Sequence, residues 1–352
     1  MKKLRVGVIG TGSLAMMHLK AYKDNPHVEL SAICDLDRKR AEQTAASLGI
    51  DKVFDDYNEM LKCDFVDAVD VITWNNTHAP ITIAALNAGK HVLCEKPPAL
   101  NASEALKMNE AAIHNNKLLM FGFVRRFGQY TQAIKEYIIS ELGEIYYVKA
   151  AYLRRCGNPG GWFAQKDISG GGPMIDLGVH IIDLAIYMMG KPKPVSVFGT
   201  TYNKLGMRNN IKGLTGYKSV NSNALDCDVE DFAYAVIKFD NGSSLFVETS
   251  WNLNIKEDTQ YMDLIGDKGG ARLLPEFEIY SEKNNYLVNV KPIIDKSVLT
   301  NQSPFVAEIN HFVDCILNGI ECISPAEDGV TIMKIIDAIY RSSETGELVH
   351  IK

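Results

Sequence analysis

The sequence lacks a long hydrophobic run, because nowhere do eighteen apolar residues follow one another. A helix that crosses a bilayer needs roughly twenty such residues, so no membrane span is expected. The N-terminal MKKLRVGVIG has the two lysines of a signal peptide, but glycines interrupt its apolar part and no small-residue cleavage site follows. These absences predict a cytoplasmic protein with no membrane partner.

Cysteine pairs and strong positive charge are also missing. The seven cysteines are an odd number without a C-x-x-C pair or metal-ligand spacing, which favours reduced thiols over a disulfide framework or a metal site. The chain has 37 basic and 43 acidic residues and a net charge of −6. No segment is basic enough to neutralise nucleic-acid phosphates, so no nucleic-acid partner is expected. The length of 352 residues favours two domains.

The first 125 residues alternate short apolar runs with amphipathic segments of about a dozen residues. The runs LRVGVIG, VELSAICD, DAVDVITW, HVLCEKP and KLLMFGFV are typical of buried strands. Strands that alternate with helices in this way predict βαβ units and a parallel sheet. Ligands of such sheets bind beyond the carboxyl ends of the strands.

A glycine loop follows the first predicted strand, and its sequence GTGSLA (residues 10–15) fits G-x-G-x-x-A. Gly10 permits a tight turn, Gly12 has no Cβ to obstruct a pyrophosphate, and the next helix directs its N-terminus at the phosphates. The predicted cofactor contacts in this loop are Gly10, Thr11, Gly12, Ser13 and Leu14.

The second predicted strand ends in Asp35. A carboxylate there can accept hydrogen bonds from both ribose hydroxyls of an adenosine and would repel a 2′-phosphate, which favours NAD over NADP. Arg38 and Arg40 lie close behind and weaken this preference. Alternatively, Asp35 caps the helix that starts near Arg38.

Two later strands end in polar residues at the same edge of the sheet. Thr73-Trp74-Asn75-Asn76 follows one strand and Glu95-Lys96-Pro97 follows the next. A lysine held by a proline at this edge can bind and polarise a substrate oxygen. Taken alone, Lys96 is equally well explained as a surface lysine that pairs with Glu95.

The second half begins with the predicted helix TQAIKEYIIS and the alternating run EIYYVKAAYLRR, and GGGPMIDLGVHIIDL then predicts a buried helix. Asp176, His180 and Asp183 recur at i, i+4 and i+7 and therefore share one stripe of that helix. Alternating runs follow, with a DNG hairpin signal between two of them. This pattern predicts an α+β domain with a largely antiparallel sheet. Residues 203–228 are polar and predict a long loop.

Together these features resemble the glucose–fructose oxidoreductase/inositol dehydrogenase (Gfo/Idh/MocA) family over nearly the whole chain. The resemblance depends on the glycine loop, residues 72–78, Cys94–Pro97, Gly122–Phe127, the 170–183 motif, VEDFAYAVIKFDNG and SPAEDG…AIYRS. It implies a Rossmann domain over residues 1–124 and an α+β domain with a large open sheet over 125–352. In that fold a last helix, about 326–343, can pack back on the first domain. The exposed sheet face implies a homodimer or homotetramer.

The resemblance also implies roles for individual residues. Lys96, Asp176 and His180 match the catalytic residues: His180 suits a base near neutral pH, Lys96 stabilises a developing alkoxide, and Asp176 orients the base or binds a hydroxyl. Asp183 either fixes the His180 tautomer or is an ordinary core residue. Gly170 to Gly172 are expected to let the backbone approach the substrate.

Further binding residues are implied at the edges of both predicted domains. The cofactor set adds Thr73, Asn75, His78, Glu95 and Lys96. The substrate set adds Arg125, Arg126, Asn158 and Trp162 to Asp176 and His180, although each of these four suits a structural role equally well.

The predicted function is an NAD-dependent oxidoreductase that transfers a hydride between a nicotinamide and a carbinol of a sugar, cyclitol or sugar derivative. Two alternatives remain: a glycoside hydrolase that uses NAD in a transient oxidation, and a non-catalytic sugar-sensing regulatory protein.

Overall fold

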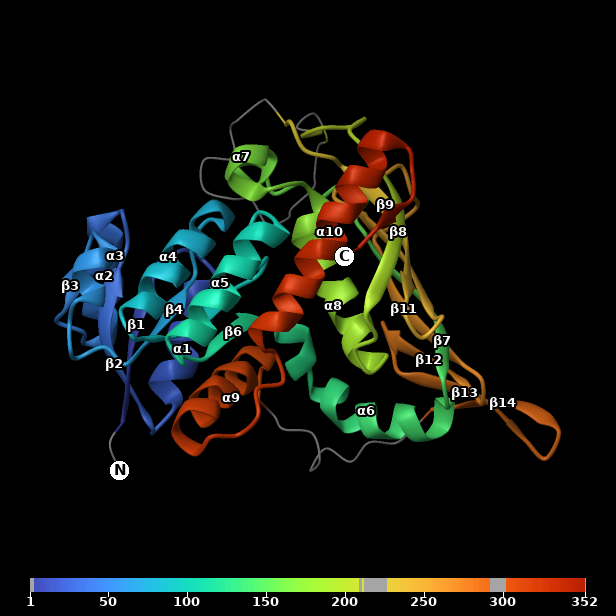
Figure 1. Ribbon diagram of the computed structural model, residues 1–352, viewed down its shortest axis with the longest axis horizontal. Helices are drawn as coiled ribbons and strands as arrows, with labels where there is room; N and C mark the ends of the chain where they lie inside the picture. Colours follow the sequence, from blue (N-terminus) through green and yellow to red (C-terminus); the bar gives the residue numbers. More distant parts are fainter. Residues whose placement is uncertain (1–2, 209–210, 212–226, 292–301, 352) are drawn as a thin grey trace. The chain divides into compact units, whose positions relative to one another are not determined.

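The structure, a computed structural model, describes residues 3–208, 211, 227–291 and 302–351 (Figure 1). The chain divides into two compact units. The first comprises Met1–Gln129 and Gln302–Val330, and the second comprises Tyr130–Asn301 and Thr331–Lys352. The sequence predicted a single boundary after residue 124. In this division the first unit instead extends to Gln129 and also includes Gln302–Val330.

The first unit contains a six-stranded sheet with the order β3-β2-β1-β4-β5-β6, and all of its strand pairs are parallel. The prediction of a parallel sheet is therefore confirmed. The strands are β1 Leu4–Ile9, β2 Val28–Cys34, β3 Val53–Phe54, β4 Ala68–Val71, β5 His91–Glu95 and β6 Leu119–Gly122.

Among the helices of the first unit, α1 packs against α9, which also contacts η1, and α4 packs against α5 and α3. They are α1 Ala15–Asp24, α2 Arg38–Leu48, α3 Tyr57–Leu61, α4 Asn75–Asn87, α5 Ala102–His114, the 3₁₀ helix η1 Val124–Phe127 and α9 Pro304–Asn318. Ile309 and Phe312 of α9 are fully buried in one core cluster with Val6, Val8 and Leu19. This shared core explains why residues 302–330 belong to the first unit.

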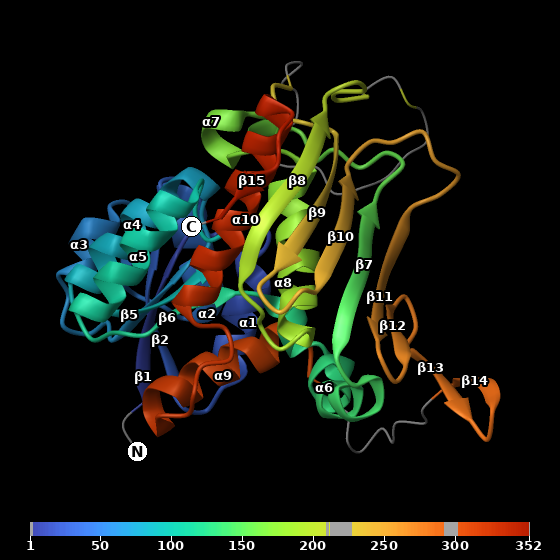
Figure 2. The ribbon, with the colours of Figure 1, turned by 45° about the vertical axis from the view of Figure 1, so that its right-hand side comes forward.

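The second unit contains a nine-stranded sheet with the order β14-β13-β12-β11-β7-β10-β9-β8-β15 (Figure 2). Only the β7–β10 pair is parallel among the described strands of this sheet, so the predicted antiparallel sheet is confirmed. The strands are β7 Ile145–Leu153, β8 Pro194–Tyr202, β9 Phe232–Phe239, β10 Ser244–Ser250, β11 Thr259–Gly266, β12 Gly270–Leu274, β13 Glu278–Lys283, β14 Tyr286–Val290 and β15 Val349–His350.

Helices cover one face of this sheet. The π-helical turn η3 and α8 pack against β10, and Ile339 of α10 contacts Gly199 of β8. The described helical segments of this unit also include α6, η2 and α7. The bounds of all six are α6 Gln129–Leu142, η2 Gly161–Ala164, α7 Lys166–Ser169, η3 Met174–Gly178, α8 Val179–Met188 and α10 Ala326–Thr345.

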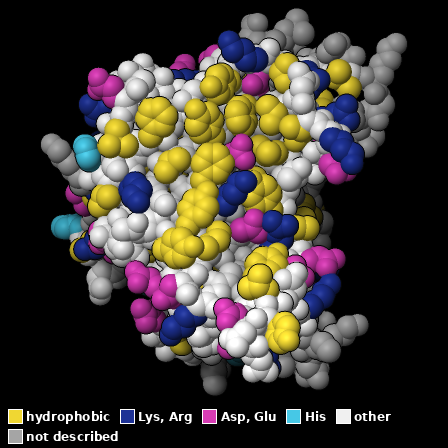
Figure 3. Space-filling view, turned by 90° about the vertical axis from the view of Figure 1, so that its right-hand side faces the viewer, with side chains coloured by type: hydrophobic (Ala, Val, Ile, Leu, Met, Phe, Trp, Pro, Cys, Tyr) yellow, Lys and Arg dark blue, Asp and Glu magenta, His cyan; other side chains and the backbone are white. Residues whose placement is uncertain are grey.

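The other face of the nine-stranded sheet carries a ladder of aromatic rings. Tyr202, Phe232, Tyr234 and Phe246 form three successive ring contacts with centroids 5.8 to 6.4 Å apart. Hydrophobic side chains gather across this face, with a few charged groups between them (Figure 3). Isolated exposed hydrophobic residues are ordinary, but a continuous apolar face marks an interaction surface.

Three further predictions concerned membrane-spanning helices, the 203–228 loop and the helix at about 326–343. No helix among the described residues is long and apolar enough to cross a membrane. Most of the predicted 203–228 loop lies outside the described residues. The predicted last helix is α10, which begins in the first unit, where Gly329 fits against Phe121, and continues in the second.

Candidate functional site

The glycine loop connects β1 to α1, and its backbone conformation at Gly10 is one that only glycine adopts readily. Gly10 has a φ of +96°, and a Cβ added there would overlap the carbonyl oxygen of Ile72. A Cβ added at Gly12 would meet nothing within 4 Å. Leu14, the N-cap residue of α1, makes no side-chain hydrogen bond to the start of the helix. Open space beside an uncapped helix N-terminus fits a pyrophosphate.

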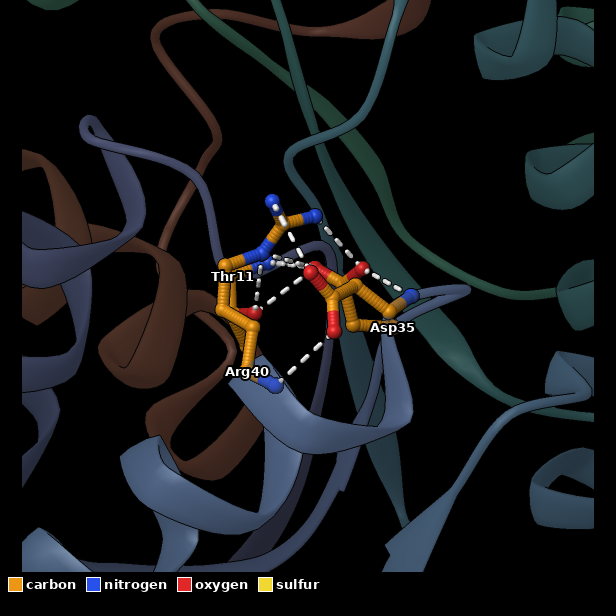
Figure 4. A network of polar contacts seen from close by, with 4 residues as sticks. Thr11, Asp35 and Arg40 are labelled. Atoms are coloured by element: carbon orange, nitrogen blue, oxygen red, sulfur yellow. Dashed lines mark hydrogen bonds and ion pairs between the residues drawn. The ribbon is translucent and has the colours of Figure 1, made fainter. Parts of the chain in front are cut away.

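Asp35 lies at the end of β2 and binds back to the glycine loop (Figure 4). Its Oδ2 accepts hydrogen bonds from the backbone N–H of Thr11 (2.7 Å) and from its hydroxyl (2.6 Å). Its Oδ1 accepts from Nη2 of Arg40 (2.7 Å) and from the N–H of Asp37 (2.9 Å). Burial alone would raise the pKa of Asp35, but the bonds from Arg40 and Thr11 outweigh it and lower that pKa.

The alternative role of Asp35 as a helix cap is taken by another residue. Asp37 is the N-cap of α2, and its side chain accepts a hydrogen bond from the N–H of Arg40 at 3.1 Å. Asp35 is thus available to a ribose only when Thr11 or Arg40 gives up part of its hydrogen bonding, because a carboxylate offers about four acceptor positions.

His78 joins the ends of β4 and β5. Its side chain is 1% exposed, its Nδ1 lies 2.8 Å from the carbonyl oxygen of Pro97, and its Nε2 lies 3.2 Å from that of Thr73. Burial lowers the pKa of His78, so the ring is neutral and Nδ1, with the shorter contact, donates to Pro97. His78 therefore holds the Lys96–Pro97 turn in place beside Thr73. Asn75, which follows Thr73 by two residues and begins α4, is also buried.

Glu95 is the last residue of β5, and the half-buried Lys96 follows it. Glu95 connects this turn to a buried histidine, His18, whose role the sequence did not reveal. Oε2 of Glu95 accepts a hydrogen bond from the backbone N–H of Lys96 at 3.0 Å, and Oε1 lies 3.1 Å from Nε2 of His18. Nδ1 of His18 lies 2.8 Å from Asp70 of β4. Gly122 lies against the Glu95 carboxylate, where a Cβ would be 3.0 Å from Oε1. The carboxylate is therefore fixed on two sides.

The charge on His18 gives a pH-dependent prediction. Burial would lower the pKa of His18, but Asp70 and Glu95 raise it well above its usual range. The folded state then keeps a proton that the unfolded state loses near pH 6.5, so this stabilisation is complete below pH 6.5 and is lost as the pH rises towards the folded pKa. Urea unfolding at pH 7.0 to 8.5 should show a decline in stability of up to about 1.4 kcal/mol per pH unit that His18→Gln lacks. Parallel pH profiles for the two proteins would contradict this.

Glu230 holds the glycine-rich segment of the second unit, residues 170–174, in place. The Glu230 carboxylate, which is buried, accepts hydrogen bonds from the N–H groups of Gly172 (2.8 Å) and Met174 (3.0 Å) and from the hydroxyl of Tyr340 (2.9 Å). A Cβ at Gly171 would overlap the Tyr340 hydroxyl, and one at Gly172 would overlap the Glu230 carbonyl. These two glycines were expected to admit a substrate, but they are required by contacts within the protein.

Asp176 and His180 lie on one continuous helical segment, as predicted, but its first turn is π-helical. Asp176 belongs to η3 and His180 to the first turn of α8. π turns inside α-helices occur frequently at functional sites. Oδ2 of Asp176 accepts a hydrogen bond from Nε1 of the fully buried Trp251 at 3.0 Å. Trp251 follows β10, so the sheet orients this carboxylate. Asp183, one turn after His180, is 1% exposed.

The four remaining candidates differ in exposure. Arg126 is 1% exposed and forms an ion pair with Asp328, and its Nη1 also donates to the carbonyl of Ile323. Asn158 is equally buried, and its Oδ1 accepts from the N–H of Gly160 at 2.9 Å. The structure thus uses both for internal contacts. Arg125 and Trp162 are half-buried, and Trp162 stacks on Phe163 with centroids 3.9 Å apart.

A parallel sheet of order 3-2-1-4-5-6 with a glycine loop and an acidic residue at the end of its second strand defines a dinucleotide-binding protein. Comparison with known families narrows this class. The model "Oxidoreductase family, NAD-binding Rossmann fold" matches residues 4–123, and "Oxidoreductase family, C-terminal alpha/beta domain" matches residues 135–351. The chain belongs to the Gfo/Idh/MocA oxidoreductase family, and NAD is its cofactor.

Individual relatives cover nearly the whole chain. D-glucoside 3-dehydrogenase of Escherichia coli K12 is 35% identical over 352 residues, covering 99% of this chain and 97% of that protein. The scyllo-inositol 2-dehydrogenase (NAD(+)) of Bacillus subtilis 168 is 29% identical, covering 99% and 96%. The structure of levoglucosan dehydrogenase with NADH and L-sorbose has a TM-score of 0.86 at 23% identity over 100% of both chains, which supports the fold.

The glycine loop gives a prediction with an internal control. Gly12→Ala adds a methyl group to open space, so thermal stability should not change while the affinity for NADH, measured by fluorescence titration, falls at least about tenfold. Gly10→Ala should lower both stability and affinity, because a left-handed φ and the Ile72 carbonyl oppose a side chain there. Equal NADH affinity in Gly12→Ala and wild type would remove the loop from the cofactor site.

The Asp35 network gives a prediction about cofactor selectivity. Asp35→Ser removes the charge that repels a 2′-phosphate and frees the Arg40 guanidinium to bind it. The ratio of kcat/KM for NADP to that for NAD should rise by about tenfold or more, corresponding to about 1.4 kcal/mol. The double variant with Arg40→Ala should lose most of this gain. A ratio unchanged from wild type in Asp35→Ser would show that Asp35 does not select the cofactor.

Proposed function

We propose that the protein is an NAD-dependent dehydrogenase that oxidises a secondary hydroxyl of a sugar, cyclitol or sugar derivative. The observation that carries this proposal is the Lys96 turn. It follows β5 directly, its backbone is held by Glu95 and His78, and it belongs to the unit that binds NAD. Asp176 and His180 supply a carboxylate and an imidazole from one helical segment of the second unit.

In the proposed reaction, NAD held at the glycine loop of Gly10 and Gly12 would supply the hydride acceptor for the carbinol carbon. Lys96 donates a hydrogen bond to the carbinol oxygen and stabilises the negative charge that develops there. His180 accepts the hydroxyl proton. Its Nδ1 is buried, so we assign Nε2 as the atom that takes the proton. Trp251 fixes Asp176, which orients the substrate or the imidazole. Thr73, Asn75, Arg125 and Trp162 remain proposed contacts of cofactor or substrate.

The substrate class can be narrowed further. We infer a D-glucoside oxidised at its third carbon, because the relative that acts on such compounds is 35% identical over almost the entire length of both chains. An inositol is the second candidate, supported by the relative of B. subtilis. Both are polyols that present a ring carbinol to the same groups.

The test is a screen of NADH formation at 340 nm with NAD or NADP across methyl glucosides, inositols, free aldoses, sugar acids and amino sugars. We expect NADH with methyl glucoside in a one-to-one ratio to a 3-keto product, and none with the 3-deoxy analogue. Release of free sugar without net NADH would contradict this proposal and favour the glycoside hydrolase that uses NAD in a transient oxidation. Absence of turnover on every class would favour the sugar-sensing protein.

We also propose that the protein is cytoplasmic and forms a homodimer or homotetramer through the aromatic face of the nine-stranded sheet. The ladder of Tyr202, Phe232, Tyr234 and Phe246 supports this assembly, since burying such rings stabilises an interface. Light scattering should give a multiple of the 39.1 kDa chain mass for the wild type and a lower multiple for Tyr234→Glu.

A further inference from the structure

Two cysteines and a histidine meet at the end of α9, and none of them takes part in the proposed reaction. His311 and Cys315 are four residues apart and therefore share one face of the helix. Gly319, with a φ of +68°, ends the helix and turns the chain so that Cys322 returns to that face. The ring nitrogen and the two sulfur atoms all lie within 4.8 Å of one another. All three side chains are half-buried and thus accessible to small reagents.

The hydrogen bonds around His311 indicate which chemistry this cluster supports. Nε2 of His311 accepts a hydrogen bond from the backbone N–H of Ile323 at 3.0 Å and lies 3.4 Å from Sγ of Cys315. A ring nitrogen that already accepts from an N–H group has no second lone pair to offer to a metal ion. The arrangement therefore favours reaction between the two sulfur atoms over metal binding.

We propose that Cys315 and Cys322 form an oxidisable dithiol that hydrogen peroxide converts into an intrachain disulfide. The Cys322 thiolate attacks one peroxide oxygen, the O–O bond breaks, and a sulfenic acid and a hydroxide ion form. The Cys315 sulfur then attacks the sulfenic sulfur, the S–S bond forms, and the sulfenic hydroxyl leaves as water. The two thiols lose two electrons and two protons in total, and the peroxide is reduced to two water molecules.

Cys322 is assigned as the attacking residue because its environment stabilises the thiolate. The hydrogen bond from Cys315 lowers the pKa of Cys322 to about 5, against the opposing effect of burial and with a smaller contribution from His311. The same bond raises the pKa of Cys315. Since the thiolate is the nucleophile, Cys322 reacts first and Cys315 resolves the sulfenic acid.

The segment that carries Cys322 is attached to the end of the parallel sheet. The carbonyl of Ile323 accepts from Arg126, and the hydroxyl of Ser324 donates to the carbonyl of Phe121 in β6 at 2.7 Å. The backbone N–H of Phe121 donates in return to the carbonyl of Ser324. Disulfide formation therefore constrains a segment that contacts the strand next to β5.

The test is oxidation of the full-length protein with a small excess of hydrogen peroxide, followed by thiol counting and peptide mapping under non-reducing conditions. We expect two fewer free thiols and one cross-linked peptide pair that contains Cys315 and Cys322. Cys315→Ser should stop at a sulfenic acid on Cys322 that dimedone traps, and Cys322→Ser should give neither product. Cys63→Ser, which changes another half-buried cysteine, should leave the cross-link intact. Cross-links among other cysteines, or loss of all thiols at similar rates, would overturn the proposal.

A second measurement does not depend on any substitution. At pH 6, iodoacetamide should label Cys322 roughly ten times faster than Cys63, since the larger thiolate fraction outweighs the lower nucleophilicity of a less basic thiolate. Equal labelling rates would overturn the assignment of Cys322 as the attacking residue. Tight stoichiometric binding of Zn²⁺ that prevents oxidation and is lost in Cys322→Ser would show a metal site instead.

Discussion

Lys96→Met should lower kcat with the preferred sugar by about 10²–10⁴-fold, while the affinity for NADH falls much less. The substitution keeps the length of the side chain and removes the ammonium group that we assign to the carbinol oxygen. The backbone of the turn does not depend on that group, because Glu95 holds the N–H of Lys96 and His78 holds the carbonyl of Pro97. Stopped-flow measurement of hydride transfer, together with NADH fluorescence titration, separates chemistry from binding.

His180→Asn is the companion variant, and the two should differ in their response to pH. If His180 takes the hydroxyl proton, its variant should lose the rise of kcat with pH near neutrality, whereas Lys96→Met should keep that rise at a lower level. Lys62→Met, in an exposed lysine paired with Glu59, is the control and should retain wild-type kinetics. Turnover within threefold of wild type in Lys96→Met would refute the proposed mechanism.

Glu230→Ala should destabilise the second unit by about 2–4 kcal/mol and lower its melting temperature by roughly 5–15 °C. The substitution leaves the N–H groups of Gly172 and Met174 and the hydroxyl of Tyr340 without their acceptor in the interior. Unpaired buried donors cost more free energy than the hydrogen bonds contributed. Calorimetry should show this loss in the transition of the second unit.

Three variants separate the loss of hydrogen bonds from the loss of charge and of volume. Glu230→Gln keeps a carbonyl acceptor of the same size and should recover about half of the lost stability. Tyr340→Phe removes one donor and leaves the carboxylate with both N–H groups, so its effect should be about 1 kcal/mol. Glu282→Ala, on the exposed side of β13, should change nothing. A melting temperature of Glu230→Ala equal to that of Glu282→Ala would show that the carboxylate does not hold the glycine-rich segment.

The features that the sequence predicted correctly are local in the chain. The glycine loop and the alternation of strands and helices depend on neighbouring residues, and both appear in the structure where they were expected. The helix that carries Asp176 and His180 was also found from its periodicity. Its π turn was not, because apolar spacing over a few residues does not distinguish 3.6 from more residues per turn.

The features that the sequence did not reveal depend on distant residues. His18 had no visible role until the sheet brought Asp70 and Glu95 to its two nitrogens. Trp251 lies far from Asp176 in the chain, and nothing in its own neighbourhood marks it as a hydrogen-bond donor to that carboxylate. The resemblance implied a second domain over 125–352 that includes residues 302–330, whereas the buried face of α9 lies in a core cluster of the first unit.

The contact between Glu230 and Tyr340 has a consequence for biosynthesis. Tyr340 lies in α10, and the neighbouring Ser342 donates its hydroxyl to the carbonyl of Glu347 and accepts from the N–H of Gly199. During translation the N-terminal part of a chain folds first, so the glycine-rich segment gains this support only after α10 has been synthesised. A nascent chain stopped before Tyr340 therefore has its glycine loop but not the finished support for Asp176. On the proposed mechanism, catalytic competence begins only once α10 has packed against Glu230.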